Sequence, residues 1–167
     1  MYSEVQPLEK LSQGDVIDGC TLLNLEPTES VSAAPSPIIY RTRVVILTQE
    51  CDLQDARTLR VVVAAVRTCQ EIVEGKILNA STIRDQLRRH LMPGWYFLPK
   101  APDSIHLPES IVEFRDLHTV FKTHLEALAT GGMRVCRIRS PWREHLSQHF
   151  AVTYMRIGLP EPYSTEI

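Results

Sequence analysis

One short polar segment between two apolar runs carries the residues best suited to chemistry. It combines a thiol, an amide and three carboxylates, contributed by Gln49, Glu50, Cys51, Asp52 and Asp55. A cysteine thiolate is a nucleophile and a metal ligand, and carboxylates act as acids, bases or metal ligands. The segment is therefore a candidate functional turn, in which Gln49 and Asp52 are candidate binding residues.

The flanking carboxylates argue against Cys51 as a catalytic nucleophile. The side chains of Glu50 and Asp52 are both anionic, and neighbouring negative charge disfavours the thiolate that such chemistry requires. A cation such as Arg43 or a histidine would have to offset them. The competing interpretation is a partly buried structural cysteine, so a cysteine-dependent enzyme at Cys51 is the less favoured alternative.

A metal site would recruit Cys51, Asp52 and a histidine such as His145 or His149. The two histidines are four residues apart, a spacing that places both on one face of a helix and that zinc-binding helices use. No HExxH motif is present, and the other three cysteines have no partner at ligand spacing. We therefore expect no metal and no other cofactor, and metal-dependent chemistry at Cys51 stays a remote alternative.

Two groups of arginines are candidate binding surfaces. Arg88 and Arg89 precede an aromatic run, and Arg139 and Arg143 lie near the start of the last predicted helix. Arginine beside aromatic side chains suits single-stranded nucleic acid or an acidic partner, although a solvated helix face would look the same. The net charge of -2 gives the chain no general attraction for phosphate, which favours a protein partner over bulk nucleic-acid binding.

Two apolar runs must position the candidate turn. Residues 43–48 and 59–66 are continuously apolar rather than alternating, a pattern typical of central strands covered on both faces. We predict that they are adjacent antiparallel strands near the centre of a sheet. An earlier strand begins at Gly14-Asp15, and the intervening residues 25–37, rich in proline, serine and alanine, predict a loop.

The second half of the chain alternates between helical and strand patterns. Residues 69–92 predict a helical insertion, 95–98 and 110–114 predict strands, and 121–128 and 142–157 predict helices. Strands, helices, strands and a final helix in this order predict an α+β protein. Its length of 167 residues fits a single domain spanning 1–167.

The order of the strand motifs resembles the PemK/MazF toxin family. Its opening Gly-Asp strand, its Arg-Pro-Val-Val-Ile strand, its Val-Ala-Ala-Ile-Thr strand and its Ser-Val-Ile-Leu strand have counterparts here in Gly14-Asp15, Arg43–Ile46, Val62–Val66 and Ser110–Val112. The resemblance implies a small, strongly bent SH3-like β-barrel over about 14–128. Beyond the family's pattern lie a helical insertion and a C-terminal helical extension over about 134–160.

The same resemblance implies a metal-independent endoribonuclease toxin of a toxin–antitoxin pair. RNA cleavage in that family uses the arginine of the second strand and a hydroxyl residue after the Ala-Ala-Ile run. Arg43 matches the arginine, but the hydroxyl position holds Arg67, and Thr68 comes one residue late. A one-residue shift turns a strand side chain to the opposite face. We therefore expect no efficient RNA cleavage and consider Arg67 a binding residue.

The segment SPWREHLSQHFAVTYMRIGLP is similar to the ending of bacterial proteins that share a Ser/Thr-Gln-x-Cys-Asp-Leu turn. Many of those proteins belong to mobile-element or phage-defence systems. The resemblance implies a non-catalytic or weakly catalytic binding component of such a system, which contacts a protein partner or nucleic acid; a homodimer stays open. No apolar stretch approaches the ~20 residues of a membrane span, and no secretory signal is visible, so we expect a cytoplasmic protein without membrane contact.

Overall fold

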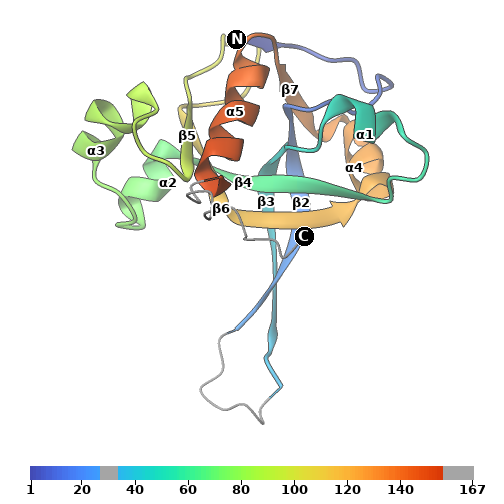
Figure 1. Ribbon diagram of the computed structural model, residues 1–167, viewed down its shortest axis with the longest axis horizontal. Helices are drawn as coiled ribbons and strands as arrows, with labels where there is room; N and C mark the ends of the chain where they lie inside the picture. Colours follow the sequence, from blue (N-terminus) through green and yellow to red (C-terminus); the bar gives the residue numbers. More distant parts are fainter. Residues whose placement is uncertain (27–33, 156–167) are drawn as a thin grey trace, which may run out of the picture.

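A seven-stranded antiparallel sheet with helices on both faces organises the chain (Figure 1). The computed structural model describes residues 1–26 and 34–155. The strand order in the sheet is β1-β7-β2-β3-β4-β6-β5. The strands are β1 (Tyr2–Ser3), β2 (Asp15–Leu25), β3 (Pro37–Ile46), β4 (Arg60–Thr68), β5 (Trp95–Leu98), β6 (Ser110–Phe121) and β7 (Arg134–Ile138).

The described residues also contain five α-helices, one 3-10 turn and one π-helical turn, and the fold is α+β as predicted. The 69–92 insertion is helical, as expected, and it packs on the outer strand β5. The elements are α1 (Glu50–Gln54), α2 (Cys69–Glu74), α3 (Ala80–Asp85), the 3-10 turn η1 (Leu87–Arg89), α4 (Lys122–Leu128), the π-helical turn η2 (Ala129–Met133) and α5 (Trp142–Tyr154).

Strands β3 and β4 form the buried centre of the sheet, which confirms the prediction of a central antiparallel pair. Val44 pairs with Ala65, and Val45 pairs with Ala64. Val44 belongs to a cluster of buried residues with Leu125 of α4, whereas Val45 belongs to another with Leu146 of α5. Adjacent residues of a strand point to opposite faces, so helices must cover both sides of this pair.

The sheet is not closed, so the predicted small barrel is not confirmed. Strand β2 pairs with β7 only through residues 15–17, and its outer half pairs with β3 alone. Strand β6 carries a bulge of three residues, because Ala65 pairs with Glu113 and Ala64 with Leu117. A bulge bends a strand and increases its twist. The outer halves of β2 and β3 extend from the body as a two-stranded arm (Figure 1).

Two predicted segments differ from the structure. The start of the predicted C-terminal helical extension, residues 134–138, forms strand β7 between β1 and β2. Its alternate residues Cys136 and Ile138 are buried, and this period of two favours a strand over a helix. The predicted loop 25–37 begins and ends inside β2 and β3. Residues 27–33 of that loop and 156–160 of the extension lie outside the described residues.

A buried carboxylate joins β2, β7 and the N-terminal segment. Asp15 is fully buried and accepts hydrogen bonds from Nε and Nη2 of Arg137 at 2.6 and 3.1 Å, and from the backbone N–H of Ser12 at 3.0 Å. Arg134 Nε lies 3.5 Å from the same carboxylate. Burial raises the pKa of Asp15, and the hydrogen bonds from Arg137 act against that rise.

Replacing Asp15 by asparagine should lower the free energy of unfolding by about 3–5 kcal/mol, because the two arginines would keep their buried charges without a counter-ion. Urea denaturation of the purified protein measures the change. Asp103→Asn is the control, since Asp103 is paired with Lys100 at 3.0 Å on an exposed loop and such pairs contribute about 0–1 kcal/mol. Equal losses in the two variants would contradict this role of Asp15.

Candidate functional site

The predicted functional turn is a short helix, α1, that is fixed to its surroundings. Glu50 accepts a hydrogen bond from the Ser12 hydroxyl, and Leu53 is buried. Lys122 donates to the carbonyl oxygen of Leu53 at 2.6 Å. One of the three carboxylates of this segment therefore anchors α1 to the N-terminal segment.

Cys51 is exposed on this helix rather than partly buried. Its sulfur lies 3.9 Å from Oε1 of Gln49 and 3.7 Å from Oδ1 of Asp52, so its polar neighbours are oxygen atoms. Arg43, the cation suggested by the sequence, is bound to Asp18. The geometry therefore gives no support to a reactive thiolate at Cys51.

Gln49 and Asp52 line a groove of about 580 Å³ between α1 and α5. Ser147 and Phe150 of α5 form part of its other wall, and Cys51 does not line it. The two residues predicted to bind are thus placed together beside the last helix, which the sequence did not indicate. Thr48, just before them, accepts a hydrogen bond from the backbone N–H of Val62 at 2.8 Å and has a structural role.

Arg43 and Arg67 share a second groove, of about 680 Å³, with Tyr40, Arg41 and Thr68. Arg43 pairs with Val66 across β3 and β4, so the side chain of Arg67, the next residue of β4, starts from the opposite face of the sheet. Both residues line the groove, but the strand register does not aim their guanidinium groups at one shared ligand. Whether this groove attracts anions depends on the charges that surround the two guanidinium groups.

Carboxylates neutralise both arginines. Asp18 binds Arg43 through both of its oxygens, with Nη2 and Oδ2 2.9 Å apart, and only 19% of the Arg43 side chain is exposed. The hydrogen bonds that Arg43 donates to Asp18 raise the pKa of Arg43. Arg67 lies 3.3 Å from Glu113 and 3.5 Å from Asp116. A bound phosphate would have to displace or share these partners.

The β6 bulge builds a polar network around Arg67 that the sequence did not reveal. Nε2 of His118 lies 2.8 Å from Asp116 and 3.2 Å from the Tyr40 hydroxyl. Burial is the main cause of the raised pKa of Glu113. A pattern of apolar residues does not disclose a three-residue bulge, so this grouping had no signal in the sequence.

Thr68, the hydroxyl residue nearest the expected catalytic position, caps α2. Its side chain accepts a hydrogen bond from the Glu71 backbone N–H at 3.1 Å, and the Glu71 carboxylate accepts from the Thr68 backbone N–H at 2.7 Å. This reciprocal pair is a capping box. Thr68 thus has a structural role that explains its presence without catalysis.

The other predicted binding arginines lie away from Arg43 and Arg67. Arg88 lines a groove of about 460 Å³ between α2 and α3, and Arg89 ends the turn η1. Arg139 follows β7, and Arg143 pairs with its neighbour Glu144 at 2.8 Å. None of these four arginines lines the groove that contains Arg43 and Arg67.

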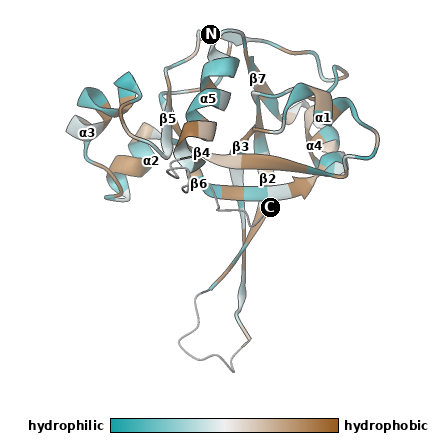
Figure 2. Ribbon diagram, viewed as in Figure 1, coloured by the Kyte–Doolittle hydropathy of each residue, from teal (hydrophilic) through white to brown (hydrophobic). Residues whose placement is uncertain are grey.

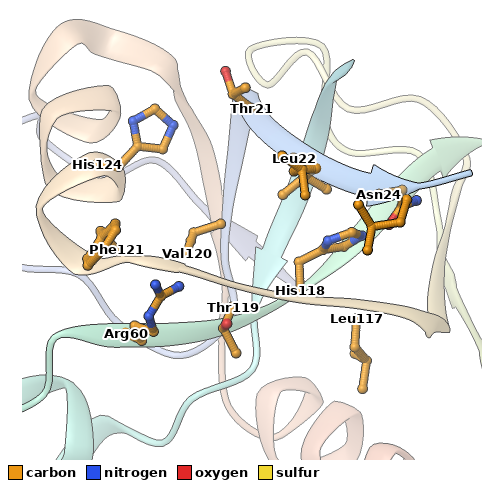
Figure 3. A pocket seen from close by; sticks show the side chains of 12 residues that line it. Thr21, Leu22, Asn24, Arg60, Leu117, His118, Thr119, Val120, Phe121 and His124 are labelled. Carbon is orange, nitrogen blue, oxygen red and sulfur yellow. The ribbon is translucent and has the colours of Figure 1, made fainter. Parts of the chain in front are cut away.

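A further groove, which the sequence did not indicate, lies between the β2–β3 arm and β6 (Figure 3). Its volume is about 670 Å³. Residues 21–25 of β2 form one wall, residues 117–121 of β6 form the facing wall, and Arg60 and His124 also line it. We call this space the β2–β6 groove.

Three histidines pack α5 against η1 and β5. The ring of His90 lies 4.4 Å from that of Tyr96, 4.8 Å from His145 and 5.8 Å from His149, measured between centroids. His145 contacts the Tyr96 hydroxyl at 3.0 Å, and Nε2 of His149 lies 3.3 Å from the Met92 carbonyl oxygen. Within residues 1–26 and 34–155, no group of three or more His, Cys, Asp or Glu side chains is arranged to hold a metal ion.

No protein-family model matches the sequence, and no curated protein matches it either. In the part of the chain that the structure describes, every helix is too short or too polar to cross a membrane.

The histidine cluster predicts a loss of stability in mild acid. Burial, with the charges of His145 and His149, lowers the pKa of His90 to about 4, whereas an unfolded histidine titrates near 6.5. The unfolded chain therefore takes up a proton first, so stability is complete above pH ~6.5 and decreases as the pH falls towards 4. Melting temperatures measured from pH 7 to pH 4.5 should show this decrease.

His90→Asn should make the melting temperature less dependent on pH. Asparagine tolerates the left-handed backbone of residue 90, whose φ is 55°, and it does not titrate. His106→Asn, at an exposed position, is the matched control and should keep the wild-type slope. If His90→Asn also keeps that slope, His90 is not the group responsible.

Proposed function

We propose that this protein is a non-catalytic binding component that contacts a partner protein through its β2–β3 arm. The resemblance of its C-terminal segment favours a bacterial mobile-element or phage-defence system. The observation that carries the proposal is an exposed apolar surface on the arm, next to the β2–β6 groove. The neutralised arginines support a protein partner over nucleic acid.

Large apolar side chains are exposed on one face of the arm. Leu23 pairs with Ile39, and Leu25 pairs with Pro37, so the four side chains share a face. The exposed fractions of Leu23, Leu25 and Ile39 are 54%, 58% and 66%. Figure 2 shows hydrophobic colour continuing from the sheet onto the β2 strand of the arm. Grouped exposed apolar side chains are typical of protein contact surfaces.

Nucleic acid is the less favoured partner because the central arginines are already paired. Arg43 is bound by Asp18, and Arg67 lies between Glu113 and Asp116. Non-specific nucleic-acid binding depends on unpaired cations that release counter-ions from phosphates. The remaining candidate arginines lie on separate elements of the described chain, and this arrangement does not favour a continuous basic surface for nucleic acid.

The antiparallel order β2-β3-β4-β6, with register shifts in β2 and β6, supports kinship with SH3-like barrels of the PemK/MazF type. In this proposal the arm and β6 form the unclosed side of such a barrel. The endoribonuclease of that family is the second candidate function, since Arg43 and Arg67 line one groove. The capping role of Thr68 and the pairing of Arg43 weigh against it.

Leu23→Glu should reduce capture of the partner protein at least about tenfold, because burial of a leucine contributes ~1.5–3 kcal/mol. The measurement is affinity capture from extracts of the producing cells, with quantitative mass spectrometry. Val152→Glu is the matched control, since Val152 is similarly exposed, at 53%, but lies on α5. Equal recovery with both variants would contradict a contact through the arm.

The wild-type protein and Arg43→Ala should both leave single-stranded RNA intact. Asp18→Asn should bind the same RNA at least threefold more tightly than wild type, because it removes the charge that neutralises Arg43. Gel electrophoresis detects cleavage, and fluorescence polarisation gives the affinity. Cleavage by the wild type that Arg43→Ala abolishes would establish the endoribonuclease instead.

A further inference from the structure

The β2–β6 groove is bordered by two strand edges. In the described residues, 21–25 of β2 pair with β3 on one side, and 117–121 of β6 pair with β4 on one side. Neither segment has a strand on its other side within residues 1–26 and 34–155. An unpaired strand edge presents backbone N–H and C=O groups that can bind a further strand.

The residues that line the groove indicate that these edges face it. They are consecutive, 21–25 on β2 and 117–121 on β6. Adjacent residues of a strand point to opposite faces of a sheet, so a space bordered by one face would be lined by alternate residues. Consecutive residues are expected where the edge itself borders the space, and Figure 3 shows the two strands on facing sides.

Arg60 gives the lining of the groove a positive charge. Arg60 and His124 both line the groove, and neither forms an ion pair in the described part of the chain. The Arg60 guanidinium lies 4.3 Å from the centre of the Phe121 ring, and this stacking holds it at the end of β6. No aspartate or glutamate lines the groove.

We propose that the β2–β6 groove binds an extended segment of a partner protein, with alternating apolar and acidic residues, as an added strand. The inference rests on the proposed function and specifies its partner. Backbone hydrogen bonds to the two edges supply the main attraction. Apolar side chains of the segment pack on Leu23 and Phe121, which line the groove and are each 54% exposed, and its acidic side chains reach Arg60 and His124.

The probe is a fluorescent eight-residue peptide of alternating valine and glutamate, titrated against the full chain by fluorescence polarisation. Two matched peptides carry lysine in place of glutamate, or N-methyl groups on every second amide, which remove strand hydrogen bonds. We expect both changes to weaken binding at least tenfold. Binding of the unmodified peptide should protect backbone amides of residues 21–25 and 117–121 from hydrogen exchange.

Arg60→Glu should weaken binding of the valine–glutamate peptide at least fivefold, and the milder Arg60→Gln should weaken it less. Arg57→Glu is the matched control, because the Arg57 side chain is 91% exposed and pairs with Asp55 outside the groove. This control should bind the peptide as wild type does. Circular dichroism confirms that each variant is folded.

Several results would overturn the inference: no binding, equal binding of the N-methylated peptide, or protection elsewhere. Protection of these amides in the absence of peptide would also overturn it, because the groove would then already be occupied. Protection that is independent of concentration would indicate a segment of the same chain, and protection that increases with concentration would indicate a second copy in a dimer. RNA cleavage would instead contradict the proposed function, and it would leave the peptide measurement unaffected. The two failures are therefore distinguishable.

Discussion

The burial of β3 and β4 on both faces is the constraint on which the rest of the structure depends. Val44 and Val45 point to opposite sides of the sheet, and both are fully buried. Because each side must be covered, α4 and α1 pack on one face, and α5 packs on the other. The faces of the central sheet are thereby used for stability. The surfaces left for recognition are strand edges, the arm and the grooves beside the helices.

Ion pairs that stabilise this architecture also limit what it can bind. Asp15 compensates the buried charge of Arg134 and Arg137 between β2 and β7. Asp18, three residues after Asp15 on β2, neutralises Arg43 of β3. A buried charge without a partner is costly, so these carboxylates are required by the fold. The consequence is a central groove in which carboxylates compensate the charges of Arg43 and Arg67.

The bulge in β6 connects the fold to both candidate sites. It separates residues 110–113, which pair with β4 and β5, from residues 117–121, which pair with β4 alone. It also turns Asp116 and His118 towards Arg67 and Tyr40. One irregularity in a single strand thus forms the polar network and leaves an edge facing the arm.

The sequence by itself determined the α+β class, the central strand pair and the 69–92 helices, because local apolar periodicity and capping residues encode them. It also identified Arg43, Arg67, Gln49 and Asp52 as polar positions next to buried strands. Only the tertiary structure decided that Asp18 neutralises Arg43 and that the sheet stays open between β2 and β6. Those features depend on strand register, on a bulge and on pairings between distant segments, and residue periodicity within one segment contains no information about them.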